Sequence, residues 1–496
     1  MEEEYIRLIF GLKLKQIRTD KNLSLFGLAK ITGLSKSYLN EIEKGKKYPK
    51  RDKIVTLADA LDTTYDQLVS LKLDKNLAPI GEILQSRLLK EIPLELFGIK
   101  ESDLIDIIAE APLKVNAFIS TLIEISKHYN VSKESFYLAA LRSYQEAQNN
   151  YFDWIEQEVE HFAKAYSIPL NQKIKASDLE EILIEEYGYT INNEELNQHQ
   201  ELTNLRSVFI PKTKLLLISK EADESQRTFI YAKEIAYNFL KLTDRLYTFS
   251  WIKFDTFDQV LTNFYASYFS GALIIPRKTL VEALKSFFEQ ETFNEDELFQ
   301  LIDRFTGSPE TFYQRLTNIL PKDFNMKNLF FLRFRYKPER DDFQMTKELH
   351  ITSTQEPHGN ENNQHYCRRW ISIKNLARIP NSESKHLIGA QISSYNDTNN
   401  KYLVLSSATK DPIRRGYYRS IALGILISPH SQGKISFLND SSIPQRLVGV
   451  TCESCSIADC RERVTPPLVL ERLERFAKTD AVVESLMEKF GGTTRS

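Results

Sequence analysis

Residues 23–49, LSLFGLAKITGLSKSYLNEIEKGKKYP, constrain the fold of this chain more than any other stretch. Apolar residues recur there at helical spacing on both sides of Gly33. They are Leu25, Leu28 and Ala29 before the glycine and Leu34, Leu39 and Ile42 after it. Because glycine readily adopts the left-handed conformation of a tight turn between helices, the segment predicts a helix-turn-helix.

The second predicted helix has Ser35 at its N-cap and polar side chains on the face opposite its apolar stripe. Short hydrogen-bonding side chains on an exposed helix face suit the reading of base edges in the major groove. The candidates for this role are Lys36, Ser37, Asn40 and Glu41. Lysines that would meet phosphates follow at the helix end, namely Lys44, Lys46 and Lys47.

Charge is unevenly distributed along the chain. The whole sequence has a formal net charge of −2, whereas residues 1–53 contain thirteen Lys or Arg and seven Asp or Glu, a net charge of +6. A basic segment on a near-neutral chain is the electrostatic footprint of a DNA-binding head attached to a larger sensor. A solvated lysine-rich face would look similar, so charge only adds weight to the motif.

The spacing L-x-x-x-x-L-A-x-x-x-G-x-S-x-x-x-L-x-x-I-E-x-G, from Leu23 to Gly45, resembles the Cro/C1-type (XRE) family of lambda- and 434-repressor-like regulators over residues 5–70. The resemblance implies a homodimer on a palindromic operator in double-stranded DNA. It also implies base readout by the four candidates, an ion pair between Arg18 and Glu43, and phosphate contacts from Ser24, Ser35, Lys44, Lys46 and Lys47.

One residue departs from the pattern of this family. Leu25 stands where many members have a glutamine that touches the DNA backbone and braces the reader helix. Some affinity or positioning must therefore come from other residues. The alternative is a helical hairpin that binds no nucleic acid.

Length and composition set wider bounds. A chain of 496 residues is expected to form three or four domains. The start, MEEEYIRLIFG, lacks a basic segment followed by an apolar run, and no stretch reaches the ~20 apolar residues of a membrane span. Four cysteines in so long a chain indicate a reducing compartment rather than a disulfide framework. We therefore expect a cytoplasmic protein without a membrane partner.

Residues 132–166 predict a long, aromatic-rich helix. Such a helix is typical of a dimer scaffold and equally of a domain core. Asn149 and Asn150 interrupt its apolar stripe, so a bend is expected there.

Residues 167–320 predict mixed α and β structure. Apolar runs flank Pro211 and Lys212 and predict a hairpin over 207–219, followed by helices at about 225–242 and 256–273. After residue 325 the chain is strand-rich, with the runs LFFLRFRY, HLIGAQIS, KYLVLSSA and SIALGILIS, and a mobile loop is expected from Thr352 to Gln364.

The hairpin, the helix QRTFIYAKEIAYNFL and the later run NFYASYFSGALIIP resemble the ImmA/IrrE-like metallopeptidase domain (peptidase family M78). In active members two His of H-E-x-x-H and a later Glu bind zinc, with the motif Glu as general base. Here these ligand positions hold Lys233, Tyr237 and Asn263, and only Glu234 of the motif remains. The resemblance thus implies a zincin-like fold with no zinc at this helix and no peptidase activity. Ordinary core packing would also explain Lys233 and Tyr237.

The cysteines suggest a second kind of site. Cys452, Cys455 and Cys460 follow the pattern C-x-x-C-x-x-x-x-C, and Cys367 is the fourth. Four thiolates suit Zn²⁺ or an iron–sulfur cluster, and spacing does not decide between them. Nearby Arg461 and Arg463 would offset their negative charge. The alternatives are a reduced cluster without metal or a redox-active thiol group.

The C-terminal cysteine pattern, followed by Arg and Pro-Pro, with LRSYQE and NNYF upstream, resembles the short-chain fatty acyl transcriptional regulators. That resemblance implies a short-chain acyl-CoA effector. We therefore predict a multidomain α+β, non-enzymatic, dimeric DNA-binding regulator. Its domains are a lambda-repressor-like head at 1–70, a helical linker suited to dimerisation at 71–166, the degenerate peptidase-like domain at 167–320 and a sensor domain at 321–496.

Two other functions stay open. One is a metal-dependent protease of the ImmA/IrrE type that cleaves a repressor. The other is a phage- or plasmid-type immunity regulator that answers to a protein antagonist rather than to a metabolite.

Overall fold

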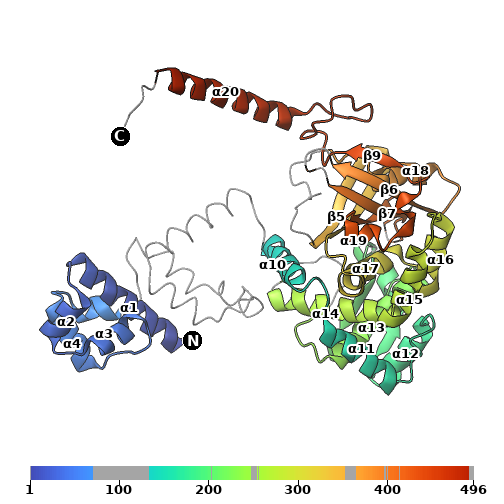
Figure 1. Ribbon diagram of the computed structural model, residues 1–496. Helices are drawn as coiled ribbons and strands as arrows, with labels where there is room; N and C mark the ends of the chain where they lie inside the picture. Colours follow the sequence, from blue (N-terminus) through green and yellow to red (C-terminus); the bar gives the residue numbers. More distant parts are fainter. Residues whose placement is uncertain are drawn as a thin grey trace. The chain divides into compact units, whose positions relative to one another are not determined.

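The computed structural model describes residues 2–70, 133–202, 204–246, 254, 256–351, 365–395, 398, 400–412 and 414–490. The chain forms two compact units, which are described separately. We call residues 2–70 the head and the described residues from 141 onward the body (Figure 1). Residues 71–132 of the predicted linker and the expected loop at 352–364 lie outside the described residues.

The head is all helical. Its helices are α1 (Glu2–Asp20), α2 (Leu25–Thr32), α3 (Lys36–Glu43), α4 (Arg51–Ala60) and α5 (Tyr65–Val69). Their apolar faces meet in one core that includes Phe10, Leu28, Leu39, Ile42 and Leu57. The predicted turn is confirmed, because Gly33 ends α2 with a left-handed φ of 69°.

The helix expected over 132–166 is interrupted. The structure has α10 (Lys133–Ala147) and α11 (Asp153–Ala165), separated by Asn149 and Asn150 with φ values of 49° and 51°. Asparagine tolerates the left-handed region better than most residues, which explains the break. The expected bend is therefore confirmed. In α11, Ile155, Val159 and Phe162 point into the body core.

A small sheet and two helices follow in the body. Strands β1 (Thr190–Asn192), β2 (Ser207–Ile210) and β3 (Leu215–Ile218) form a sheet of order β1-β3-β2, with β2 and β3 antiparallel as the hairpin pattern predicts. Two helices follow the sheet, α13 (Glu224–Phe239) and α14 (Phe257–Ile274). Helix α12 (Ala176–Glu185) precedes β1 and packs on α13. Both helices expected from the sequence at 225–242 and 256–273 are present.

Three further helices lead to the second sheet: α15 (Arg277–Phe288), α16 (Glu295–Phe305) and α17 (Pro309–Asp323). Side-chain caps start two of them, since Asn294 accepts from the backbone of α16 and Ser308 from that of α17. These three helices were not predicted from the sequence.

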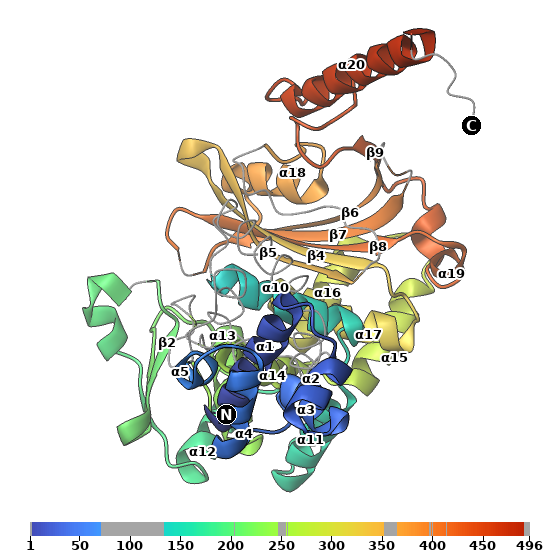
Figure 2. The same cartoon turned by 90° about the vertical axis from the view of Figure 1, so that its left-hand side faces the viewer.

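The second sheet has six strands in the order β5-β4-β8-β7-β6-β9. They are β4 (Leu329–Lys337), β5 (Asp342–Ile351), β6 (His386–Tyr395), β7 (Lys401–Lys410), β8 (Tyr418–Leu426) and β9 (Gln445–Val448). The four strand runs expected from the sequence correspond to β4, β6, β7 and β8. Helix α18 (Ile371–Arg378) covers one face, and α16 and α17 lie on the other (Figure 2).

The remaining elements are short, apart from the last helix. They are α19 (Pro429–Gln432), α20 (Leu468–Phe490), and the 3-10 helices η2 (Glu195–Gln198), η3 (Gln200–Leu202), η4 (Pro211–Thr213), η5 (Pro338–Arg340), η6 (Ile379–Asn381) and η7 (Ser436–Asn439). The described part of the chain has no helix with the length and apolarity of a membrane span. The mixed α+β class with a helical head is confirmed, while the zincin-like assignment stays a prediction.

Candidate functional site

Two serines hold the helix-turn-helix in shape. Ser24 Oγ caps α2 by accepting a 2.9 Å hydrogen bond from the Gly27 amide, and Ser35 Oγ caps α3 by accepting one of 3.2 Å from the Tyr38 amide. Both serines are exposed, so each hydroxyl still has its proton to donate. Helix N-termini attract phosphate groups, which suits the predicted contacts of both serines with DNA phosphates.

The predicted base-reading residues lie on α3. Lys36, Ser37 and Asn40 are exposed, whereas Leu39 and Ile42 are fully buried in the head core. The burial of the apolar stripe fixes the rotation of the helix and so decides which side chains face outward. Three of the four predicted readers therefore share the outward face of α3.

Glu41, the fourth predicted reader, is only half-exposed and is engaged with Lys47. The Lys47 ammonium lies 2.8 Å from a Glu41 carboxylate oxygen and 5.9 Å from the centre of the Tyr38 ring. The hydrogen bond to Glu41 raises the pKa of Lys47. The pair connects α3 to the lysine-rich loop, which also contains Lys46, while Lys44 follows directly after the helix.

A bidentate ion pair joins α1 to the reader helix. Arg18 donates hydrogen bonds of 2.7 and 2.9 Å to the two carboxylate oxygens of Glu43, and its third contact is a 2.6 Å bond to the Leu23 carbonyl. Gly11 lets the helices approach, because a Cβ there would lie 2.3 Å from the Ile42 carbonyl oxygen. The Arg18–Glu43 pair expected from the family resemblance is present.

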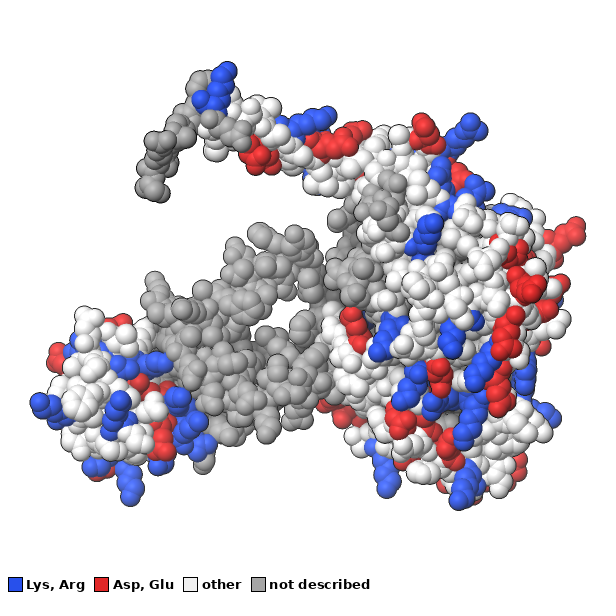
Figure 3. Space-filling view, viewed as in Figure 1, with Lys and Arg blue, Asp and Glu red and all other residues white. Residues whose placement is uncertain are grey.

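Leu25, the residue that departs from the family pattern, packs partly buried against the head core. Its side chain therefore contributes to the packing of the head. Lys and Arg side chains project from several sides of the head in Figure 3, with Asp and Glu between some of them. The basic character expected from the sequence is carried by these surface residues.

In the body, the three positions that the peptidase resemblance assigns to zinc ligands come together. Lys233 Nζ donates a 2.6 Å hydrogen bond to Asn263 Oδ1, and the Tyr237 hydroxyl lies 3.5 Å from the same oxygen. Lys233 and Tyr237 come from α13 and Asn263 from α14. An ammonium, a phenol and a carboxamide thus occupy the place of three ligands.

Burial lowers the pKa of Lys233 to about 7, and the nearby cations Arg245, Lys347 and Arg206 act in the same direction, while Glu234 opposes them. Such a lysine exchanges its proton near neutral pH. Its ammonium form would repel a divalent cation, and its nitrogen is held by Asn263 Oδ1.

Glu234, the general base of the motif, is also engaged. Arg245 Nη2 lies 2.6 and 2.8 Å from its two carboxylate oxygens, and the Tyr189 hydroxyl donates to it at 3.0 Å. The Arg245 guanidinium lies over the rings of Phe209 and Tyr237, 4.0 and 4.3 Å from their centres. Arg245 was not predicted as a site residue, because its only signal in the sequence is an arginine eleven residues after Glu234.

The four cysteines line one small cavity of about 10 Å³. Cys367, Cys452 and Cys455 are buried, and Cys460 is half-buried. Burial raises the pKa of the Cys367 thiol to about 11, and the thiols of Cys455 and Cys452 add to this. The residue types alone suggest that Cys367 joins the three later cysteines. In the structure all four line the same cavity.

Backbone pairing brings Cys367 to the other three. Residues Tyr366 and Thr451 form an antiparallel bridge, and the Cys367 amide donates to the Val450 carbonyl at 3.0 Å. Arg463 donates hydrogen bonds to the carbonyls of Cys452, Cys455 and Ile457. The arginine expected to offset thiolate charge therefore also folds the cysteine loop.

The donor set suits a thiophilic metal, since four thiols converge. Within the described residues, however, no three His, Cys, Asp or Glu side chains stand in a metal-binding arrangement. The thiols are thus neighbours whose side chains would have to reorient toward an ion. Among the described residues that line this cavity, Glu462 is the one side chain besides the cysteines that commonly binds metals.

Parts of the chain are similar to known proteins. Residues 14–68 match the family model described as Helix-turn-helix. A solved structure of a Mycobacterium tuberculosis transcriptional regulator is 18% identical with a TM-score of 0.46, covering 66% of this chain and 92% of that chain.

The restriction-modification controller protein C.AhdI from Aeromonas hydrophila is 37% identical with a TM-score of 0.12, covering 12% of this chain and 94% of that chain. No curated protein matches the chain. The family match runs from within α1 to within α5 and includes α2, α3 and α4, so the chain carries an XRE-type helix-turn-helix domain at its N-terminal end.

Proposed function

We propose that this chain is a sequence-specific transcriptional regulator that binds a palindromic operator in double-stranded DNA as a homodimer. The observation that carries the proposal is α3, which exposes Lys36, Ser37 and Asn40 while its apolar side chains fix it to the head core. A helix held this rigidly can enter the major groove with its N-terminal residues toward base edges.

In this proposal the contacts divide into two classes. Lys36, Ser37 and Asn40 read bases, with Glu41 joining them when its pair with Lys47 opens. The capped helix ends at Ser24 and Ser35 and the lysines that follow α3 bind phosphates, which positions the head without reading sequence.

Helix α20 supports self-association. Positions 469, 473, 476, 480, 483, 487 and 490 alternate spacings of four and three, and all but Asp480 are apolar. This spacing is typical of the seam of a coiled coil. Leu473, Phe476 and Met487 are 57%, 61% and 67% exposed, so the seam is not used within the body. A second copy of the same helix would cover it, which fits the two half-sites of a palindrome.

The body, in this proposal, senses rather than cuts. The replacement of all three ligand positions by Lys233, Tyr237 and Asn263, and the capture of Glu234 by Arg245, support a non-catalytic domain of the ImmA/IrrE type. A short-chain acyl-CoA is the effector that the family resemblance suggests. A Zn²⁺ ion or an iron–sulfur cluster at the four cysteines would stabilise the sensor domain.

Protein–DNA affinity tests this function directly. The full chain and a Lys36→Ala, Asn40→Ala variant would be titrated by fluorescence anisotropy with DNA from upstream of the chain's own gene and with a scrambled duplex. Loss of about 1–3 kcal/mol per base contact predicts at least tenfold weaker specific binding. Lys21→Ala is the matched control, since Lys21 lies after α1 and pairs with Asp62.

The rival function, a metal-dependent protease, gives the opposite results. It predicts zinc at the Lys233–Tyr237 helix, chelator-sensitive cleavage of a repressor and DNA binding that does not depend on Lys36 or Asn40. Equal affinity of the wild type for specific and scrambled DNA would contradict the proposed regulator.

A further inference from the structure

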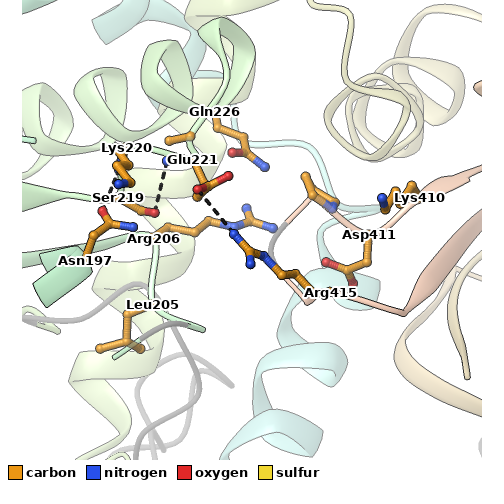
Figure 4. Close-up of a pocket in the computed structure, with 12 residues that line it drawn as sticks. Asn197, Leu205, Arg206, Ser219, Lys220, Glu221, Gln226, Lys410, Asp411 and Arg415 are labelled. Carbon is orange, nitrogen blue, oxygen red and sulfur yellow. Dashed lines mark hydrogen bonds and ion pairs between the residues drawn. The ribbon is translucent and has the colours of Figure 1, made fainter. Parts of the chain in front are cut away.

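A cavity of about 520 Å³ opens in the body at the start of α13. Its walls come from the segment 197–226 and from the loop that connects β7 to β8, which are about two hundred residues apart in sequence (Figure 4). The volume falls in the range typical of pockets for small molecules, so it exceeds the needs of a single bound ion.

The lining of this cavity is dominated by cations. Four positively charged side chains and two negatively charged ones line it, namely Arg206, Lys220, Lys410 and Arg415 against Glu221 and Asp411. Arg415 forms a salt bridge of 3.7 Å with Glu221, which leaves cations in excess over carboxylates in the lining. A concave surface with this excess of positive charge concentrates anions.

Gln226 supplies a second and independent observation. It is only 9% exposed, and its Oε1 accepts the Asp223 amide at 3.2 Å in the capping box of α13. Its Nε2 is buried and has no hydrogen-bond partner among the described residues. A buried donor without an acceptor is unfavourable, and a ligand oxygen that accepted from it would remove that penalty.

Figure 4 shows the Gln226 amide directed toward the guanidinium groups of Arg206 and Arg415. Burial lowers the pKa of Arg206 to about 10; Glu310 opposes this, and the neighbouring guanidinium groups of Arg419 and Arg333 add to it. The donors that converge here are therefore an amide and cations, which call for a negatively charged acceptor. The first turn of α13 contributes its positive dipole end.

We propose that this cavity binds a phosphate-bearing small molecule, with a phosphate or phosphoanhydride group held by Gln226, Arg206 and Lys410. Arginine and lysine together match multiply charged phosphate oxygens better than a single carboxylate. The cavity leaves room for an organic portion beyond the phosphates. Binding here does not depend on the DNA contacts, whereas a role of this ligand as the effector rests on the proposed function.

Isothermal titration calorimetry on the full chain tests the site with three probes: inorganic pyrophosphate, ADP and adenosine. We expect binding of pyrophosphate, of ADP, or of both, weakening as KCl rises, and no binding of adenosine. Pyrophosphate without ADP would assign an inorganic ligand, and ADP at higher affinity would assign an organic phosphate. Adenosine binding as tightly as ADP, or no binding of either phosphate probe, would overturn the proposal.

The deciding variant is Gln226→Glu, which keeps the acceptor of the capping box but places a negative charge among the phosphate oxygens. We expect at least tenfold weaker phosphate binding, whereas Gln432→Glu on exposed α19 should bind like the wild type. Lys410→Gln, expected to weaken binding severalfold, decides the matter if Gln226→Glu does not fold by circular dichroism. Unchanged affinity in the folded Gln226→Glu variant would refute the site.

DNA binding measured on the same preparations separates the two ideas. Phosphate binding without any DNA preference would refute the proposed regulator and leave this site standing. DNA binding without phosphate binding would refute this site and leave the proposed regulator standing.

Discussion

Lys233 Nζ lies 2.6 Å from Asn263 Oδ1, so a buried ammonium and a carboxamide join α13 to α14 where the peptidase resemblance expects a metal. The contact is part of a larger polar group, since Glu234, next in sequence to Lys233, binds Arg245. Hydrogen bonds and one ion pair therefore hold together elements that a metal ion would otherwise connect. Side chains of the chain itself therefore stabilise this part of the body.

Stability should depend on pH through Lys233. Its pKa in the folded body is about 7 against 10.5 for the ordinary group, so between these values the unfolded chain binds more protons than the folded one. The contribution of Lys233 to stability therefore rises as pH increases from 7 to 10.5 and is constant below 7. The rise is at most about 1.4 kcal/mol per pH unit.

A Lys233→Met variant should lack this rise. Urea unfolding of the body, followed at pH 6, 7, 8 and 9, would show the wild type gaining stability relative to the variant above pH 7. Lys278→Met, at an exposed lysine that pairs with Glu160, is the control and should track the wild type. A constant difference between wild type and Lys233→Met across this range would show that Lys233 does not titrate there.

Breaking the Arg18–Glu43 pair should destabilise the head. Arg18→Met leaves the carboxylate of Glu43, which is 4% exposed, without its partner, and the expected cost is about 3 kcal/mol. Arg18→Met combined with Glu43→Leu should regain part of that loss, because no buried charge remains. Thermal unfolding of the head would be followed by circular dichroism, and equal loss in the single and double variants would argue against a charge effect.

Salt dependence should separate phosphate contacts from base contacts. Lys46→Ala is expected to weaken binding to specific and scrambled DNA alike and to lower the slope of log K against log[KCl] by about one. Asn40→Ala should instead weaken binding to the specific duplex while leaving the slope unchanged. The salt slope would be measured by fluorescence anisotropy titrations at KCl concentrations from about 50 to about 300 mM, a range that includes physiological ionic strength. Identical salt slopes for Lys46→Ala and wild type would remove Lys46 from the phosphate contacts.

Helix α20 should control the oligomeric state. Leu473→Glu places a charge in the exposed seam and is expected to convert dimers to monomers in light scattering after size exclusion. Ser485→Glu adds the same charge on the opposite side of the helix and should leave the dimer intact. A dimer that survives Leu473→Glu would place the subunit contact elsewhere in the chain.

The cysteine site should hold about one metal centre per chain in protein purified without oxygen. Cys452→Ser with Cys455→Ser is expected to lose it, while Ser454→Ala, between the two, should keep it. Elemental analysis for zinc and iron, with sulfide determination and an absorption spectrum, distinguishes a zinc site from an iron–sulfur cluster. A metal-free wild type would favour the reduced or redox-active thiol group.

Much of the head was predictable because its signals are local. Ser24, Gly33 and Ser35 fix helix ends through contacts within a few residues, and the apolar spacing fixes which face of α3 is buried. The β2–β3 hairpin followed from two apolar runs around Pro211 for the same reason. The strand β5 was missed because its residues alternate imperfectly and are mostly only half-buried.

The sequence by itself determined the helix-turn-helix, the identity of its outward residues and the absence of the usual zinc ligands in α13. The tertiary structure decided that Lys233 meets Asn263, that Cys367 joins the cysteine loop through the Tyr366–Thr451 bridge, and that Gln226 faces the loop after β7. These pairs are separated by tens to hundreds of residues. Their meeting depends on how whole layers pack, which spacing along the chain does not encode.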